Sequence, residues 1–187
     1  VMRGAVGSEV QLGLRSARGD LKVIAVKRAR LVLGLPRARM AGEGIGFIGL
    51  PLLTAETPAG VRAAVAELEK QGARGFIIDL RGSRGGQVQA MEQVAGIFVP
   101  KGGVLWVVEM TGEGRHVVKS AGPGDVKAPL AVLIDGETQG SELLASAIKT
   151  RHRGIVVGQR SSGTCAVRKV EARPDGTAAF KEIGRFM

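Results

Sequence analysis

The sequence is poor in aromatic residues, cysteine and histidine, and each shortage excludes a kind of site. Aromatic residues make up 3% of the 187 residues and tyrosine is absent. The core must therefore be aliphatic, and nucleic-acid bases find almost no rings on which to stack. Cys165 is the one cysteine, so an internal disulfide is excluded and a structural zinc site is disfavoured. His116 and His152 lie far apart in sequence, and we expect neither a metal nor another cofactor.

Long apolar runs are also missing. No run of about 18 apolar residues occurs, so we expect no membrane-spanning helix. A secretory signal is absent as well. The chain begins in what reads as the middle of a domain, so we expect a fragment, and the missing signal leaves the compartment unknown. Hydrophobic residues nevertheless make up 44% of the chain, enough for one packed domain or a domain plus a fragment.

The charge is strongly positive, at a formal +10. Such a charge suits nucleic acid or an anionic membrane as a partner. The basic residues are scattered, however, and the densest runs cover only residues 27–30 and 151–153. We interpret them as a solvated basic face. A basic nucleic-acid-binding module remains the less favoured alternative, and it predicts one continuous positive face and a steep salt dependence of binding.

Apolar residues follow the periods of strands and helices along the whole chain. Alternation on both sides of an "ARGD" turn predicts a β-hairpin over residues 9–28, which cannot be stable alone. A helix is predicted over residues 58–71, with Thr57 as its cap and Pro58 in its first turn. The other predicted elements are strands at 45–50, 75–80, 130–135 and 154–158, helices at 87–98 and 141–151, and hairpins at 104–120 and 167–183. This alternation predicts an α/β fold with a parallel or mixed sheet.

Two loops follow buried strands and lead directly into helices, which is where such folds place functional groups. They read "RGSRGG" over residues 81–86 and "DGETQG" over residues 135–140. The amides of Gly85 and Gly86 lie near a helix start and suit a phosphate or a developing oxyanion. The lysine of a phosphate-binding loop is absent. A tight turn between strand and helix is the plainer alternative.

Both loops lie in segments that resemble one enzyme family. "GFIIDLRGSRGG" resembles the "LILDLRxNPGG" block of the carboxyl-terminal processing, or tail-specific, serine peptidases of S41 type. "PLAVLIDGETQGSELLASAIKTRHRGIVVGQRSSGT" is similar to the segment that holds the Ser–Lys dyad of that family. The resemblance implies a ClpP/crotonase-like mixed β-sheet core with flanking helices. It also implies that residues 1–30 are the C-terminal part of a PDZ-like domain and that 31–187 are a peptidase-like core, truncated at its C-terminus.

The resemblance further implies an activity and a setting. Family members cleave proteins near their C-termini, so the expected partner is a protein or peptide substrate with a C-terminal tail. A periplasmic or other extracytoplasmic location and a homo-oligomeric state are compatible with the family. No cofactor is implied.

The dyad positions themselves depart from the family pattern. The nucleophilic serine lies two residues before the serine of the Ser141–Glu142 pair, and that position holds Gln139. The lysine that acts as general base aligns with Thr164, and the glutamine that assists it aligns with Arg168. An amide is a poor nucleophile, a threonine hydroxyl is no base near neutral pH, and arginine stays charged. We therefore expect a catalytically impaired or inactive pseudopeptidase.

Other side chains offer a fallback for catalysis. Ser141 is the nearest hydroxyl, although an ordinary helix N-cap is the favoured interpretation of it. Lys149 lies eight residues further along the same helix, about 12 Å away by helical rise, too far to take a proton from Ser141. Ser161 and Ser162 lie in the loop that faces the site in the family. A rewired hydroxyl pair therefore stays open.

The backbone donors are better preserved than the side chains. Amides of Gly85 or Gly86, together with that of Gly140, suit a carbonyl or a carboxylate, and main-chain donors tolerate side-chain change. The alternative to a peptidase is therefore a peptide- or apolar-ligand-binding module on the same fold.

Overall fold

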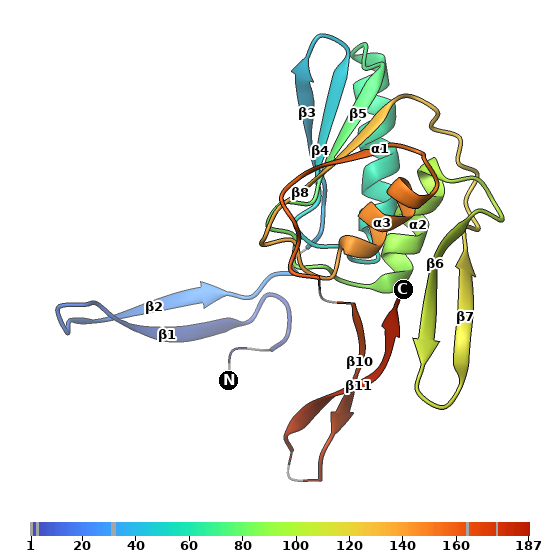
Figure 1. The fold of residues 1–187 in the computed structure, drawn as a ribbon. Helices are drawn as coiled ribbons and strands as arrows, with labels where there is room; N and C mark the ends of the chain where they lie inside the picture. The colour runs from blue at the N-terminus through green and yellow to red at the C-terminus, as the bar shows by residue number, and fades with distance from the viewer. Residues whose placement is uncertain (1, 3, 31–32, 164, 175) are drawn as a thin grey trace. The chain divides into compact units, whose positions relative to one another are not determined.

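The computed structural model describes residues 2, 4–30, 33–163, 165–174 and 176–187. The chain divides into two compact units, Val1–Val32 and Leu33–Met187. The first unit holds one antiparallel hairpin of β1 (Glu9–Arg15) and β2 (Leu21–Lys27), shown in blue in Figure 1. This confirms the hairpin predicted over residues 9–28, while its origin in a PDZ-like domain stays a prediction.

A five-stranded mixed sheet forms the centre of the second unit. Its order is β3-β4-β5-β8-β9, with bounds β3 (Arg37–Gly42), β4 (Ile45–Gly49), β5 (Gly75–Asp79), β8 (Leu130–Ile134) and β9 (Ile155–Gly158). β3 and β4 are antiparallel, and the other neighbours are parallel. Parallel strands bring their carboxyl ends to one edge, so the loops after β5 and β8 become neighbours. The predicted mixed α/β fold is confirmed.

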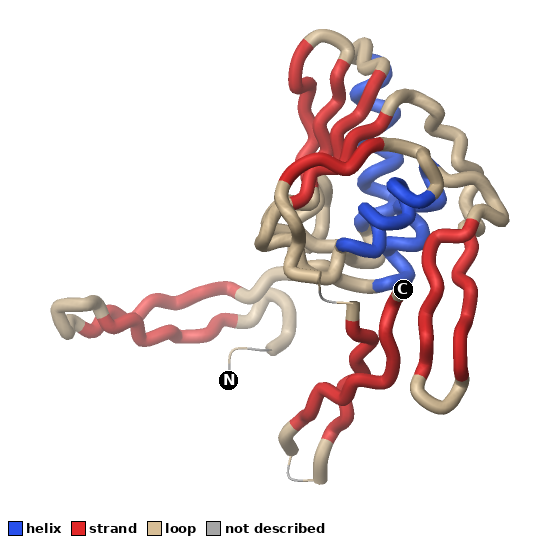
Figure 2. The backbone as a smooth tube through the Cα atoms, in the orientation of Figure 1, coloured by secondary structure: helices blue, strands red, loops and turns tan. Residues whose placement is uncertain are grey.

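Three helices pack on one face of this sheet, as Figure 2 shows in blue. They are α1 (Thr57–Lys70), α2 (Val88–Phe98) and α3 (Glu142–Thr150). Alternate strand residues meet the apolar stripes of the helices and exclude water there. The largest fully buried side chains are Ile48, Leu50, Leu53, Leu68, Ile78, Leu80, Met91, Ile97, Phe98, Leu105, Leu144 and Ile148. The core is thus almost entirely aliphatic, as the composition predicts.

A second sheet of four strands has the order β10-β11-β6-β7. Its strands are β6 (Val104–Met110), β7 (Gly114–Lys119), β10 (Ala166–Ala172) and β11 (Ala178–Phe186). Both predicted hairpins are confirmed, and the pairing of β11 with β6 joins them. Trp106 and Phe186 meet edge to face across that pairing, with ring centroids 6.3 Å apart.

Two features near α1 differ from the sequence-based expectation. β3 is not among the predicted strands, because "RARMAG" is short and mostly polar or small. Thr57 is the first helical residue, and Glu56 takes the N-cap position. The Thr57 hydroxyl is instead buried and donates to the carbonyl of Gly34 at 2.8 Å, while it accepts the N–H of Thr54 at 2.8 Å. The hydroxyl ties the start of the helix to a distant loop.

Candidate functional site

The loops after β5 and β8 are bound to each other by three hydrogen bonds. The N–H of Gly82 donates to the Asp135 carboxylate at 3.0 Å. The buried Thr138 hydroxyl donates to the Leu80 carbonyl at 2.9 Å. The N–H of Gln139 donates to the Ser83 carbonyl at 2.9 Å. The structure thus brings together the two loops that the sequence singles out.

The Asp135 carboxylate is the electrostatic centre of this contact. The bond from the Gly82 N–H lowers the pKa of Asp135. The N–H of Glu137 lowers it further, as does the Thr138 hydroxyl, whose one proton is shared between Asp135 and the Leu80 carbonyl. Nearby, burial acts to raise the pKa of Asp79, but two bonds from the Arg81 guanidinium, at 2.8 and 2.9 Å, hold it below its usual value. Both environments therefore favour the ionised form of the aspartate.

Glycine is required where the two loops touch. Gly85 and Gly140 have φ of 70° and 72°, a left-handed conformation that residues with a Cβ rarely adopt. A Cβ on Gly85 would also lie 2.9 Å from the Gln139 carbonyl oxygen and 3.0 Å from the Gly140 Cα. The loops therefore approach through bare backbone, and peptide groups line their junction.

These peptide groups leave donors available. Leu53 donates to the Gly85 carbonyl and accepts from the N–H of Gln87, so the parallel bridge turns the N–H of Gly86 away from Leu53. Among the residues that the structure describes, no protein acceptor bonds the N–H of Gly85, Gly86 or Gly140. Free N–H groups beside two helix starts suit an oxyanion or a carboxylate.

Two buried hydroxyls flank the junction. Ser141 is fully buried and takes the N-cap position of α3, with φ −95° and ψ 2°. Its hydroxyl makes no capping bond, because this backbone is far from the extended conformation that aims an N-cap side chain at the helix amides. The expected position of Ser141 is confirmed, and the expected capping bond is wrong. Ser83 is equally buried, and neither Oγ has a partner within the described part of the chain.

Residues 44–187 match peptidase family S41. The chain belongs to that family. It is 26% identical over 188 residues to the carboxy-terminal processing protease CtpA of Bacillus subtilis, covering 100% of this chain and 40% of that protein. It is 30% identical over 184 residues to CtpB of the same organism, covering 94% of this chain and 38% of that one. The chain therefore spans less than half the length of these relatives.

A solved structure confirms the fold. The photosystem II D1 C-terminal processing protease superposes with a TM-score of 0.71 at 25% identity, over 98% of this chain and 52% of that one. The resemblance to carboxyl-terminal processing peptidases inferred from the two loop motifs is thus confirmed.

Within this S41 chain, the residues expected at the dyad positions lie in different settings. Gln139 is exposed in the loop after β8, and only its backbone N–H is held by the neighbouring loop. Thr164 lies outside the described residues. Arg168 is exposed on β10, opposite Glu182 and just past a bulge. No hydrogen bond or ion pair between described residues joins Arg168 to Gln139 or Gly140.

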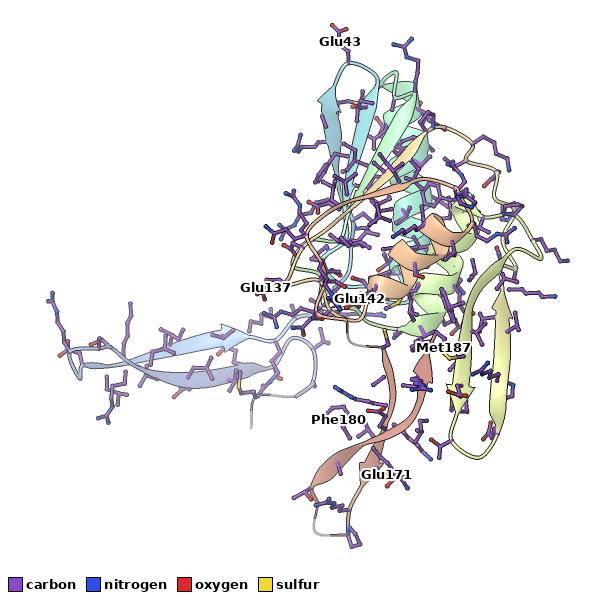
Figure 3. The ribbon with its side chains drawn as sticks, in the orientation of Figure 1. Glu43, Glu137, Glu142, Glu171, Phe180 and Met187 are labelled. Carbon is purple, nitrogen blue, oxygen red and sulfur yellow. The ribbon has the colours of Figure 1, made fainter. Side chains whose placement is uncertain are left out.

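One hydroxyl–carboxylate contact lies beside the site. The Ser162 hydroxyl is 3.1 Å from Glu142 Oε1 and 3.0 Å from the Thr138 carbonyl, and it has one proton to donate between them. Glu142 stands at the start of α3, where Figure 3 labels it. Its Oε2 is buried and has no partner in the described ranges. Sequence reasoning names Ser162 but misses Glu142 and Ser83 as buried polar groups, because no periodicity shows which polar side chains of a loop turn inward.

The two buried serines of the site lack a basic partner among the described residues. No lysine or histidine of the described residues hydrogen-bonds to Ser83 or Ser141. Lys149 stands at the opposite end of α3 from Ser141. Across the described residues, no three His, Cys, Asp or Glu side chains are grouped to hold a metal, and no helix is long and apolar enough to cross a membrane.

Proposed function

We propose that this chain is an S41 relative whose Ser–Lys chemistry has been replaced and which binds polypeptide tails without cutting them. The observation that carries the proposal is that, where the two loops meet, reactive side chains are missing while backbone N–H donors are present. Glutamine occupies the nucleophile position, and the nearest serine, Ser141, is buried without a hydrogen-bond partner in the described structure. Backbone donors at Gly85, Gly86 and Gly140 remain available beside it.

The residues at the dyad and assisting positions cannot carry out the two chemical steps of the family reaction, nucleophilic attack and proton removal. The amide nitrogen of Gln139 has a delocalised lone pair and does not attack a peptide carbonyl. Thr164 at the base position cannot accept a proton near pH 7. Arg168 retains its charge at any pH of interest and only donates hydrogen bonds. Proton removal and nucleophilic attack are therefore both missing, while binding of the substrate carbonyl is not.

The ligand that fits the retained donors is a carbonyl or carboxylate at the end of an extended peptide. Backbone N–H groups bind ionised oxygen with short, charge-assisted hydrogen bonds. The chain's net charge of +10 adds a long-range attraction for an anionic tail. The relatives are named for carboxyl-terminal processing, which agrees with a tail as the ligand.

A binding experiment tests this proposal directly. Fluorescence anisotropy would compare a labelled peptide ending in Leu-Ala-Ala, with a free carboxylate, against its C-terminal amide. The free acid should bind at least about tenfold more tightly, since charge-assisted bonds are roughly twice as strong as neutral ones. Gly140→Ala should weaken binding about fivefold or more, because its φ of 72° penalises a Cβ and shifts the donor.

Gly136→Ala is the matched control in the same loop. A Cβ on Gly136 meets no atom within 4 Å, and its φ is not positive. It should therefore bind the peptide as the parent does. Equal affinity for acid and amide, or equal weakening by both glycine variants, would remove the support for a carboxylate site at Gly140.

One observation favours a second candidate function, residual hydrolysis by Ser162. Its hydroxyl lies 3.1 Å from the Glu142 carboxylate, an arrangement in which a carboxylate takes a serine proton. Carboxylates are ordinarily weak bases toward an alcohol, so such catalysis is slow. Fluorophosphonate labelling on Ser162 that is lost in both Ser162→Ala and Glu142→Gln would establish this activity. Absence of label on the folded protein would reject it.

Nucleic-acid binding has less support than peptide binding. Several arginines are engaged within the protein: Arg62 pairs with Asp125, Arg81 with Asp79, and both Arg115 and Arg185 with Glu109. Paired arginines contribute less to phosphate binding than free ones. Retention on a DNA column that falls steeply with salt would revive this alternative.

A further inference from the structure

Strand β9 has one edge that no described strand pairs with, here called the open edge. It is the last strand in the order β3-β4-β5-β8-β9 and pairs only with β8 among the described strands. The N–H of Gln159 donates to the Ile134 carbonyl, and in a parallel ladder every second residue faces the partner strand. Ile155 and Val157 therefore direct their backbone groups toward β8, while those of Val156 and Gly158 face the open edge.

A groove runs beside this edge, along one face of α3. A cavity of about 740 Å³ is lined by Ser146, Lys149, Thr150, His152, Gly154, Ile155 and Val156. A second cavity, of about 250 Å³, is lined by Ile134, Glu142, Ala145, Ser146, Lys149, Val156 and Ser161. The two share Ser146, Lys149 and Val156, so they are adjacent, and together they are here called the groove. From Lys149 to Glu142 it spans about 10 Å of helix, equal to about three residues of extended chain.

The groove has a graded chemical character. Its narrow end, the smaller cavity, has aliphatic walls of Ile134, Ala145 and Val156 and also contains the polar side chains of Glu142 and Ser161. Lys149 lines both cavities. The exposed Lys149 ammonium has no salt bridge to a described carboxylate. His152 lines the wide end. A bound peptide could place an aliphatic side chain in the narrow end and, two residues later, an acidic side chain beside Lys149. The aliphatic walls and the Lys149 ammonium would then each have a partner of matching chemistry.

The backbone of His152, at the wide end of the groove, is strained. Its φ of 50° is the only positive φ of a non-glycine residue in the described ranges. Its N–H donates to the Lys149 carbonyl and that of Arg153 to the Ile148 carbonyl, which is the Schellman ending that usually places glycine at this position. Strained backbone tends to cluster at functional sites.

We infer that this groove binds an extended polypeptide segment, which adds to β9 as a further strand. Its main chain pairs with Val156 and Gly158, an aliphatic side chain enters the narrow end, and an acidic side chain faces Lys149. Main-chain pairing supplies affinity in such strand addition, and alternate side chains supply specificity. The inference rests on the proposed function only in taking polypeptide as the ligand, because the groove binds an internal segment and needs no terminal carboxylate.

The test uses a ligand that the Gly140 donors cannot hold. A fluorescein-labelled peptide TVTETVTET, acetylated and amidated at its ends, presents valine and glutamate alternately on one face and has no free carboxylate terminus. Fluorescence anisotropy with the 187-residue chain should show saturable binding. N-methylation of alternate amides should weaken it at least about tenfold, since the strand-pairing donors are removed.

Variants of the protein test the side-chain contacts. Lys149→Glu should weaken the binding of the glutamate peptide TVTETVTET about threefold or more. The same change should have little effect on the binding of the glutamine peptide TVTQTVTQT. Lys169→Glu is the control, with the same charge change at an exposed position on β10 of the second sheet. Val156→Pro removes an N–H at the open edge and should abolish binding, with circular dichroism to confirm folding.

Two results would overturn the inference. One is equal binding of the N-methylated peptide, and the other is equal weakening by Lys149→Glu and Lys169→Glu. A further comparison separates this site from the proposed tail site. Gly140→Ala should leave TVTETVTET binding unchanged, even if the free-acid peptide of the proposed function fails to bind at all.

Discussion

The Asp135 carboxylate joins the two site loops by accepting the Gly82 N–H, a hydrogen bond that is stronger when the carboxylate is ionised. Its pKa is lowered in the folded chain, first by the Gly82 N–H and then by the Thr138 hydroxyl. A lowered folded pKa means that the contribution of Asp135 to stability is complete above its unfolded pKa, near 3.8, and is lost as the pH falls through the folded value.

We therefore predict that Asp135→Asn lowers the urea midpoint of unfolding at pH 6, and that the difference from the parent shrinks below about pH 4. Urea titrations at pH 6, 4 and 3 measure this. A difference between variant and parent that stayed constant over that range would show that the charge of Asp135 is not what binds the loops.

Arg153 is an internal structural residue in spite of its charge. Its guanidinium donates to the carbonyls of Phe98, Val126 and Ala128 at 3.1, 2.6 and 2.7 Å, and burial lowers its pKa. Arg153→Met would leave these carbonyls without their donor, so we expect a loss of about 2–4 kcal/mol in the free energy of unfolding. Arg151→Met, at an exposed position, should change it by less than about 0.5 kcal/mol. Urea unfolding of both variants measures the contrast.

His152 adopts a conformation better suited to glycine. We predict that His152→Gly raises the free energy of unfolding by on the order of 0.5–1 kcal/mol, and with it the melting temperature. The reason is that removal of the Cβ relieves the left-handed strain at φ 50°. The net gain is small since glycine loses more backbone entropy on folding. Differential scanning calorimetry measures it, and a lower melting temperature would show that the His152 ring makes contacts that outweigh the strain.

At the scale of elements, the loop between β5 and α2 depends on one glycine. Gly86 has φ 137°, and a Cβ there would overlap the carbonyl oxygen of Leu53. Gly86→Ala should therefore unfold this loop locally or cost about 2 kcal/mol or more of stability. Gly82→Ala is the control within the same loop, because its φ is also positive but no atom lies within 4 Å of the added Cβ. Hydrogen exchange of the loop amides compares the two.

Local patterns in the sequence predict most elements of the second unit. The helices, the parallel strands and both hairpins follow from apolar periodicity and turn residues, because burial of one face imposes the spacing. The features that escape prediction depend on contacts distant in sequence. The Thr57 hydroxyl bonds Gly34 instead of capping α1, and β11 pairs with β6.

The sequence predicts the position of the two backbone loops that form the candidate site, but it does not predict which polar side chains are buried there. The two loops and their glycines follow from the position of each loop after a buried strand. The burial of Ser83 and Ser141 and the contact of Ser162 with Glu142 do not, since a loop residue turns inward or outward according to packing that no short pattern records. The absence of a capping bond at Ser141 is likewise a property of its φ and ψ.

At the scale of the whole molecule, the chain has the architecture of its family, and we propose that its chemistry differs. It matches peptidase family S41 over residues 44–187 and spans less than half of its relatives. The sheet and the helices bring the loops after β5 and β8, with their backbone N–H groups, to one edge of the sheet. Under the proposed function, the side chains of the site determine whether a bound peptide is cut, and binding by main-chain donors does not depend on those side chains.

The measurement that tests the central claim most directly is fluorophosphonate labelling with mass spectrometry, together with a cleavage assay on an unfolded protein with an apolar C-terminal tail. We predict no labelled serine and no cleavage by the parent chain. A variant with Gln139→Ser, Thr164→Lys and Arg168→Gln restores the family residues and should gain label at position 139. Label on Ser141, Ser161 or Ser162 of the parent, with cleavage lost on substitution of that serine by alanine, would contradict the account.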